Sequence, residues 1–262
     1  MQRFARIPAA LAVLAAATFA TAPTWANGIV SFRAEYKYFI GEGDADAGGG
    51  VQENRVNCTA WVQSSRVRMQ GANLLPSRQQ LETRETLDGR GMTFTHSVSF
   101  AGRPAVTTEA AAMRGEGGKP ALVRFTSPKA RSLRLPRGTM FPAAFYLRTL
   151  RELQRARDAA VPRTPVFGMA WRGRDVIYVE ARRLRSSEPL FNRVEGDSHL
   201  LDAPAIDIEL RYYAGPTAKK PLYRVVYKLH ANGIYSRAVY YHPVATFTVE
   251  LTSVHELEKA AC

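Results

Sequence analysis

Apolar and polar residues alternate along much of the chain, and this period of two is typical of β-strands that bury one face. The first such segment, residues 29–40, reads IVSFRAEYKYFI and puts every second side chain from Val30 to Ile40 on one apolar face. Residues 204–213 and 245–251 show the same alternation. Shorter strand-like stretches cover residues 56–62, 67–70, 92–100 and 121–125. The pattern predicts a mainly β protein, and the glycine-rich residues 41–50 predict a flexible turn after the first strand.

The pair Asn232-Gly233 lies between two alternating segments and is a strong hairpin signal, because both central residues of a type I′ turn need a positive φ. A two-residue turn here pairs Val225 with Tyr240 and Tyr227 with Ala238 on one face. His230 then meets Tyr235 on the opposite face, where Lys228 also meets Arg237. The last pair is repulsive unless an acidic residue of a neighbouring strand lies beside it.

One segment has a helical period instead. Residues 142–158 begin with a proline, which suits the first position of a helix, and carry an apolar stripe. The other side of this predicted helix holds Arg148, Arg151 and Arg155. These arginines are a candidate face for an anionic partner, although a row of charges on a helix is more often a solvated surface.

The first 26 residues have the composition of a secretory signal peptide, with two arginines, an apolar run and small residues before the expected cleavage after Ala26. A membrane-spanning helix needs about 20 uninterrupted apolar residues, and Pro23 comes too early for that. We therefore expect an exported, periplasmic protein whose mature chain, residues 27–262, forms one domain and has no transmembrane segment. The formal net charge of the whole chain is +13, and removal of Arg3 and Arg6 leaves +11. In an exported protein this charge favours anionic envelope surfaces over nucleic acid, or simply maintains solubility.

The chain has two cysteines, Cys58 and Cys262. An oxidising compartment allows them to join, and an even count without a CxxC motif leaves one bond to form. We predict a Cys58–Cys262 disulfide that stabilises the fold. Two thiols without a nearby histidine cluster do not favour a metal site, and we expect neither a metal nor a cofactor.

Catalytic motifs are missing from the sequence. The five histidines are scattered, and the spacings HExxH, GxSxG and a P-loop do not occur. Aromatic residues are more suggestive, since several share a strand face and would either pack in the core or line a groove of an unfilled, curled sheet. The candidate groove residues are Tyr36, Tyr38, Trp61, Tyr212, Tyr223, Tyr227 and Tyr240.

Several blocks, in order along the chain, resemble the EipB-like family of periplasmic cell-envelope integrity proteins. They are NCTAW, TRETLDGRGMTF, LPRGTMFPAAFYLRTLREL, PLYRVVYKLHANGIYSRAVYYHPVATFTVEL and ELEKAAC. The resemblance implies an open, spirally wound antiparallel β-barrel with one principal α-helix and a bond between the two cysteines. The family's Cys-Asp-Gly-Trp turn reads Cys58-Thr59-Ala60-Trp61 here, and its Phe-Asp-Gly turn reads Phe167-Gly168-Met169.

The resemblance also implies a non-enzymatic role in the integrity of the Gram-negative envelope. We expect a protein that binds an envelope component, such as lipid or peptidoglycan, or a periplasmic protein. A carrier of lipid or lipoprotein is the alternative, because such carriers also use an unclosed β-barrel with a helical lid. A hydrolase whose catalytic residues are distant in sequence is the third class.

Overall fold

The computed structural model describes residues 29–41, 45–71, 74–115, 121–155, 158–171, 174–185 and 193–259. Most of these residues form β-strands, as the alternating pattern predicts. The elements in chain order are β1 (Phe32–Ile40), β2 (Ala45–Val56), β3 (Ala60–Gly71), β4 (Leu74–Thr86), β5 (Gly91–Phe100), β6 (Val106–Met113), β7 (Leu122–Ser127), β8 (Arg131–Arg134), α1 (Pro142–Arg155), β9 (Ala160–Trp171), β10 (Arg174–Arg183), β11 (Glu195–Gly196), the 3-10 helix η3 (Ser198–Asp202), β12 (Ala205–Tyr213), β13 (Tyr223–His230), β14 (Tyr235–His242) and β15 (Ala245–Glu256).

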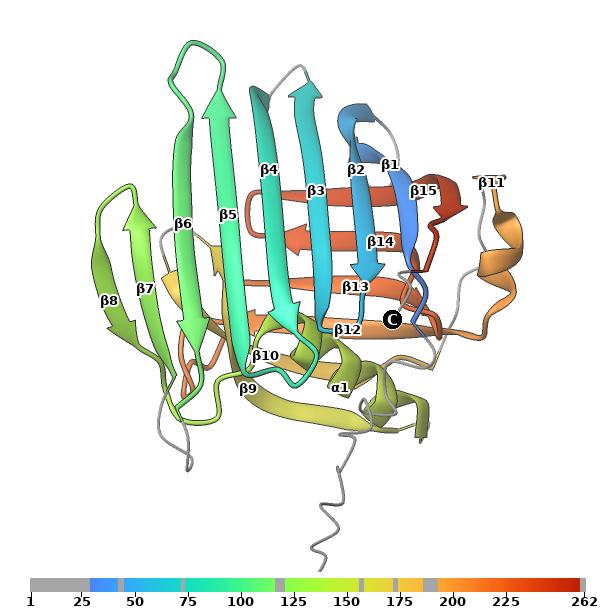
Figure 1. Cartoon of the computed structure of the whole chain (residues 1–262). Coiled ribbons are helices and arrows are strands. Elements are labelled where there is room, and N and C mark those ends of the chain that lie inside the picture. The colour runs from blue at the N-terminus through green and yellow to red at the C-terminus, as the bar shows by residue number, and fades with distance from the viewer. Residues whose placement is uncertain are drawn as a thin grey trace, which may run out of the picture.

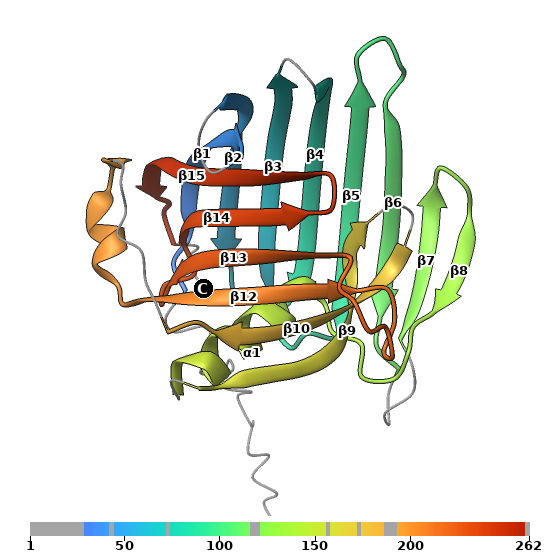
Figure 2. The same ribbon diagram turned by 180° about the vertical axis from the view of Figure 1, so that it is seen from behind.

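All fifteen described strands belong to one sheet, in the order β8-β7-β6-β5-β4-β3-β2-β1-β15-β14-β13-β12-β10-β9, with the short β11 beside β15. Every pair along this path is antiparallel. The sheet coils so that β2 to β6 cross in front of β12 to β15 (Figure 1). From behind, β12 to β15 run across the first set of strands (Figure 2).

The sheet does not close, because its two end strands, β8 and β9, are not hydrogen-bonded to each other. The segment before α1 covers part of the gap instead. Met140 forms a bridge with Val166 of β9, through hydrogen bonds from the Met140 N–H to the Pro165 carbonyl and from the Phe167 N–H to the Met140 carbonyl. Arg131 of β8 also pairs in a bidentate manner with Asp175 of β10, at 2.7 and 2.9 Å. The predicted fold, an open antiparallel β-barrel with one principal α-helix, is confirmed.

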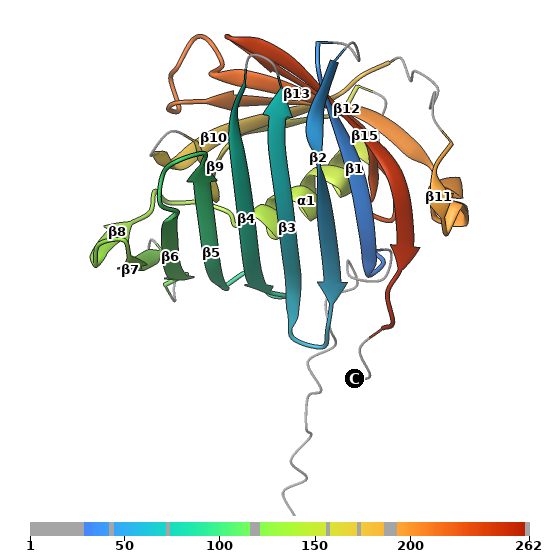
Figure 3. The same cartoon turned by 90° about the horizontal axis from the view of Figure 1, so that it is seen from above.

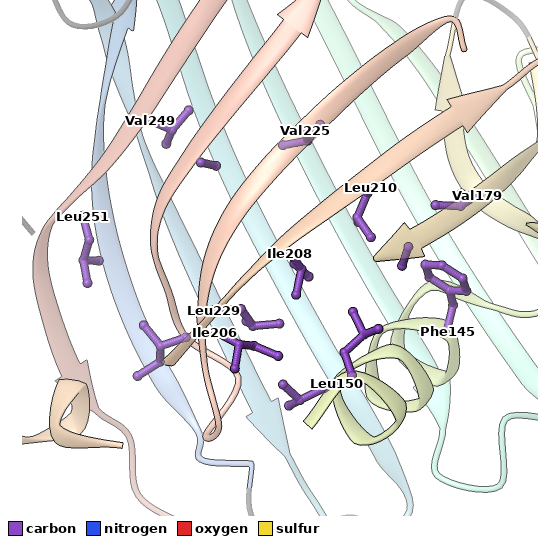
Figure 4. Close-up of a cluster of buried hydrophobic side chains, with 14 of the residues drawn as sticks. Phe145, Leu150, Val179, Ile206, Ile208, Leu210, Val225, Leu229, Val249 and Leu251 are labelled. Atoms are coloured by element: carbon purple, nitrogen blue, oxygen red, sulfur yellow. The ribbon is translucent and has the colours of Figure 1, made fainter. Parts of the chain in front are cut away.

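The helix α1 lies between the two layers of the coiled sheet (Figure 3). Its buried side chains, which include Phe145, Leu150 and Leu153, point into the larger of two hydrophobic clusters. The side chains of β12, β13 and β15 converge on the same cluster (Figure 4). We call the side of the sheet that faces α1 the inner face and the opposite side the outer face. A second cluster joins β5, β6 and β7 to the segment before α1 and to β9.

The helix prediction is confirmed at its start and ends earlier than expected. α1 runs from Pro142 to Arg155, Asp158 lies in a turn, and residues 156–157 are outside the described part. Within that part, no helix is long and apolar enough to span a membrane. The predicted signal peptide also lies outside the described residues, so it stays a prediction.

Two of the predictions for the first third of the chain were wrong. The predicted strand at residues 56–62 is interrupted, because the Asn57 side chain accepts hydrogen bonds from the Thr59 and Ala60 N–H groups and turns the chain between β2 and β3. The glycine-rich residues 45–50 are strand β2 and not a flexible turn. Gly48 has a φ of 123°, and a side chain there would place its Cβ 2.0 Å from the Arg68 carbonyl oxygen. Glycine thus permits close contact between β2 and β3.

The 232–233 hairpin is present, but its turn has a different form. The pairs Val225–Tyr240 and Tyr227–Ala238 are confirmed. Nearer the turn, the Gly233 N–H donates to the His230 carbonyl, Gly233 has a φ of 93°, and the register shifts by one residue. These are the features of a three-residue loop with a bulge. The shift moves Tyr235 to the inner face, so the predicted pair of Tyr235 with His230 was wrong.

Candidate binding site

The most distinctive feature of the inner face is a group of tyrosines, which we call the tyrosine cluster. Its members come from α1, from β1 on one side of β15, and from β14, β13 and β12, which follow one another on the other side of β15. All of them belong to the larger hydrophobic cluster or pack against it. They are Tyr36 and Tyr38 of β1, Tyr146 of α1, Tyr212 of β12, Tyr223 and Tyr227 of β13, and Tyr235 and Tyr240 of β14.

The rings of this cluster contact one another in defined geometries. Tyr36 stacks on Tyr235 with a centroid distance of 4.5 Å, and Tyr212 stacks on Tyr223 at 4.3 Å. Tyr227 forms T-shaped contacts with Tyr235 and Tyr240, with centroid distances of 5.6 and 6.1 Å. Contacts of this kind add to the stability that burial alone provides. The rings of β1, β13 and β14 therefore form one continuous aromatic surface.

The hydroxyl groups of the cluster are partly satisfied from within. The Tyr36 hydroxyl donates to the Tyr235 carbonyl at 3.3 Å, and the Tyr146 hydroxyl donates to the Gly233 carbonyl at 2.9 Å. The hydroxyls of Tyr227 and Tyr240 lie 3.3 Å apart. Burial raises the pKa of the Tyr36, Tyr227 and Tyr240 hydroxyls above the ordinary value for a phenol, so they stay neutral at physiological pH.

The cluster is only partly closed to solvent. Tyr36 and Tyr212 are buried, whereas the remaining six tyrosines keep an intermediate exposure. Gly50 of β2 lies against Tyr38, since a Cβ on Gly50 would be 3.2 Å from the Tyr38 ring and hydroxyl. The glycines of β2 thus leave room for the Tyr38 side chain at the junction of the two layers.

The predicted groove residues are therefore mostly brought together. Six of the seven lie in the tyrosine cluster, whereas Trp61 is buried on β3, which pairs only with β2 and β4. Tyr146 and Tyr235 were missed by the sequence interpretation. The helical stripe could have indicated Tyr146, which lies one turn before the buried Leu150, but the position of Tyr235 depends on the bulge.

The helix arginines differ from one another. Arg148 donates to Glu152 at 2.7 Å within the helix and also approaches the Met140 sulfur at 3.8 Å. Arg151 and Arg155 are exposed, and neither has an ion pair within 4.0 Å in the described part of the chain. The anionic-partner face thus consists of two exposed arginines and one that is already paired.

The first turn of α1 is held by an acidic residue from the sheet. The buried Glu85 of β4 accepts hydrogen bonds from the Ala143 and Ala144 N–H groups, both at 2.8 Å. A carboxylate is favourable at this end of a helix, where N–H groups have no partner within the helix. Burial nevertheless raises the pKa of Glu85 to about 7, against the opposing effects of these hydrogen bonds and of Arg114. This contact fixes α1, and with it Tyr146, relative to β4.

One histidine lies next to a serine, as in a hydrolase, but in a closed environment. The His230 Nε2 is 2.9 Å from the Ser236 hydroxyl, and its Nδ1 is 3.1 Å from the Ala203 carbonyl. Both side chains are buried, and burial lowers the pKa of His230. The group that orients the imidazole is a carbonyl instead of a carboxylate. This arrangement serves the packing of the hairpin and gives a substrate no access to the hydroxyl.

Only one half of the predicted disulfide lies within the described residues. Cys58 lies in the turn between β2 and β3, whereas Cys262 is outside the described residues. The Cys58–Cys262 bond therefore stays a prediction.

An unclosed antiparallel barrel around one helix, with a tyrosine-lined inner face, defines the class of structure. A model of the EipB-like family matches residues 25–257, and the chain therefore belongs to the EipB-like family. It is similar to a solved structure, a β-barrel-like protein of the domain of unknown function DUF1849 from Brucella abortus. That comparison has a TM-score of 0.75 at 18% identity and covers 88% of this chain and 99% of the other. Among curated proteins there is no match.

Proposed function

We propose that this protein is an exported, periplasmic and non-enzymatic binding protein that contributes to the integrity of the cell envelope. Membership of the EipB-like family and the charge of the mature chain support this role. The observation that carries the binding function is the partly exposed tyrosine cluster on the inner face of an unclosed sheet.

The chemistry of the cluster suits an amphipathic ligand. Tyrosine offers a large apolar ring and one neutral hydroxyl, and few rotatable bonds are immobilised when it binds. Tyr223, Tyr227 and Tyr240 keep partly exposed surface, so a ligand can contact them without opening the core. The exposed Arg151 and Arg155 of α1 would contact an anionic group of the same partner through their forked donors.

A complementation experiment tests this function in cells. Deletion of the gene is expected to sensitise cells to detergent and to antibiotics that act on the cell wall. A copy with Tyr223→Ser and Tyr240→Ser is expected to complement poorly at equal abundance, because the ligand loses two rings. The matched control, Tyr223→Phe with Tyr240→Phe, keeps both rings and is expected to restore most of the resistance. A deletion without an envelope phenotype would contradict the proposed role.

The helix face needs a separate variant. Arg151→Glu with Arg155→Glu reverses two exposed charges and leaves the Arg148–Glu152 pair intact. Poor complementation with an unchanged melting temperature is expected if these arginines bind the partner. Full complementation at equal abundance would show that this face is only solvated.

The alternative function, carriage of lipid or lipoprotein, rests on the same apolar inner face. Mass spectrometry of protein purified from the periplasm distinguishes the two. A lipid that copurifies in a one-to-one ratio and is lost from the Tyr223→Ser, Tyr240→Ser variant would favour the carrier. A bound protein or glycan lost from the same variant would favour the scaffold function.

A further inference from the structure

On the outer face of the described strands, two arginine or lysine residues stand directly opposite each other on neighbouring strands in three places. Like charges in this position destabilise a sheet by roughly 0.2–1 kcal/mol unless an opposite charge is near. The three pairs are Lys228–Arg237, Arg211–Arg224 and Arg68–Arg78. They differ in what surrounds them.

The first pair is flanked by acidic residues. In the same row across the sheet, Asp207 of β12 stands beside Lys228, and Glu250 of β15 stands beside Arg237. The repulsion between Lys228 and Arg237, which the hairpin sequence predicts, is thus compensated by one acidic residue on each side.

The second pair shares one buried carboxylate. Glu209, which has a side-chain exposure of 1%, accepts hydrogen bonds from Arg211 at 2.8 Å and from Arg224 at 3.0 Å, and also from Arg182. Burial by itself would raise the pKa of Glu209, but the donors from Arg182 and Arg224 hold it below its ordinary value. This pair is therefore compensated as well.

The third pair has no such partner. Arg68 is flanked in its row by Gly49 of β2, and Arg78 by Ser99 of β5. Both arginines are exposed, and neither has an acid within 4.0 Å in the part of the chain that the structure describes. Two exposed arginines therefore stand opposite each other here without a described acid in ion-pair range.

These two arginines also line a groove on the outer face. The groove has a volume of about 710 Å³ and runs across β1 to β5. A second hollow of about 400 Å³ adjoins it, shares Arg68, Arg78 and Ser99, and adds Arg103. We call the larger one the arginine groove, and its β3, β4 and β5 side chains on the outer face are Arg66, Arg68, Arg78, Gln80, Ser97 and Ser99. Glu35 and Lys37 of β1 line its other side, where Glu35 is paired with Arg33 and Lys37 with Asp46. In Figure 1 this face of β2 to β5 is turned towards the viewer.

We propose that the arginine groove binds the phosphate ester of a polyhydroxy compound. Arg68 and Arg78 would take the phosphate oxygens, because guanidinium groups match this anion with two parallel donors. The hydroxyls of Ser97 and Ser99 and the amide of Gln80 would bond to the hydroxyls of the ligand. The argument rests on charge complementarity and on the groove, and it is independent of the function proposed for the inner face.

The test compares two variants that change the charge equally. Arg68→Gln with Arg78→Gln removes two positive charges from the arginine groove. The matched control, Lys228→Gln with Arg237→Gln, removes two positive charges from a compensated pair on the same outer face. Any difference between them reflects the site and not the net charge.

Binding is measured by calorimetry on the full mature protein at about 0.15 M salt, where long-range attraction is screened. The probes are glycerol 3-phosphate, inorganic phosphate and glycerol. Glycerol 3-phosphate is expected to bind wild-type protein more tightly than inorganic phosphate, and glycerol is expected not to bind. The groove variant should weaken binding of glycerol 3-phosphate at least tenfold, and the control variant less than twofold.

Vesicles identify the source of the phosphate ester. Sedimentation with phosphatidylglycerol vesicles, lost in the groove variant and retained in the control, would assign the ligand to a lipid headgroup. If only soluble glycerol 3-phosphate binds, the ligand is a free phosphate ester. Phosphatidylcholine vesicles, whose headgroup carries no net charge, should sediment neither protein.

Three results would overturn the proposal. The first is equal weakening by the two variants, which would mean that net charge alone binds the probe. The second is that wild-type protein binds none of the phosphate probes. The third is that inorganic phosphate binds as tightly as glycerol 3-phosphate, since the serine and glutamine contacts would then be absent.

Stability gives an independent readout of the same pair. Because Arg68 and Arg78 repel each other, the groove variant is expected to raise the melting temperature by about 1–2 °C. The control variant, which leaves Asp207 and Glu250 without their partners, is expected to lower it. A groove variant that melts as low as the control would show that the two arginines are compensated, and the premise of the site would fail.

Discussion

Two clusters of aromatic side chains in this protein differ in their burial and packing. One is the tyrosine cluster on the inner face of β1, β12, β13 and β14. The other, which we call the phenylalanine cluster, lies where the two ends of the sheet approach each other, and joins β5, β7 and β9 to the segment before α1. It consists of Phe94, Phe125, Phe141 and Phe167.

The two groups differ in burial and geometry. Each phenylalanine is at most 8% exposed, and Phe167 meets the other three edge-on at 5.7 to 6.4 Å. Most of the tyrosines keep an intermediate exposure, and several of their hydroxyls are hydrogen-bonded to backbone carbonyls or to one another. The phenylalanine cluster therefore packs across the open side of the barrel, whereas the tyrosine cluster keeps part of its surface exposed.

The largest expected effect is the loss of the central phenylalanine ring. Phe167→Ala leaves a cavity between three other rings and should lower the free energy of unfolding by about 3–5 kcal/mol. Tyr223→Ala, which removes a partly exposed ring, should lower it by less than half as much. Urea denaturation of the two variants measures both values. Equal losses would contradict the division of roles between the clusters.

The next effect concerns Glu85, which holds the helix that connects the two clusters. Its pKa is about 7 in the folded protein and 4.5 without the effects of the fold. Between these pH values the folded state keeps a proton that the unfolded state has lost. The contribution of Glu85 to stability is therefore present at low pH and declines as the pH rises from about 4.5 to 7, by up to about 3 kcal/mol.

Glu85→Gln removes this titration and serves as the reference. The difference in unfolding free energy between wild type and variant should fall by up to about 3 kcal/mol between pH 5 and pH 8. All other groups are common to both proteins and cancel. A difference that does not change with pH would mean that the Ala143 and Ala144 N–H groups keep Glu85 ionised throughout.

Alternation along the chain predicted much of the fold, but it failed where one residue changed the register. The strand at residues 32–40 and the helix start at Pro142 follow from local periodicity and match the structure. The position of Tyr235 does not follow from periodicity, because the bulge reverses the face of every residue between the turn and the register shift. Asn232 helps to fix this loop, since its side-chain amide donates to the Leu200 carbonyl, a contact 32 residues away in sequence.

Contacts that lie far apart in the sequence were the other limit. The glycines of β2 have no side chains, so the sequence shows no alternating pattern at these positions. That they form a strand depends on their contacts with Tyr38 and β3. The Arg68–Arg78 pair likewise depends on the register of β3 against β4. Tyrosine and phenylalanine also occupy equivalent positions in an alternating apolar pattern. Their division into two clusters follows only from the packing of the folded chain.

A smaller effect is expected where β2 supports the tyrosine cluster. Gly50→Val would place its Cβ 3.2 Å from the Tyr38 ring and 3.0 Å from the Arg66 carbonyl oxygen. Overpacking of this kind should lower stability by about 1–3 kcal/mol. Gly215→Val is the control, because no atom other than those of its chain neighbours lies within 4 Å of a Cβ at that position. If Gly50→Val proves as stable as this control by thermal melting, Tyr38 has more space than its contacts indicate.

The smallest effect should come from the hydroxyls that distinguish the tyrosine cluster from the phenylalanine cluster. Tyr227→Phe keeps the ring and removes one partner of the 3.3 Å contact with Tyr240, which should lower stability by about 1 kcal/mol. Removal of both hydroxyls, in Tyr227→Phe with Tyr240→Phe, should cost less than the sum of the two single changes, because the Tyr227–Tyr240 contact is then lost only once, although the Tyr212 hydroxyl also loses its contact with Tyr227. The reverse change, Phe94→Tyr, adds a hydroxyl to an entirely apolar environment and should destabilise more than either. If the double variant is instead the least stable of the three in urea denaturation, the tyrosine hydroxyls are structural like the phenylalanine rings, and the contrast between the two clusters is lost.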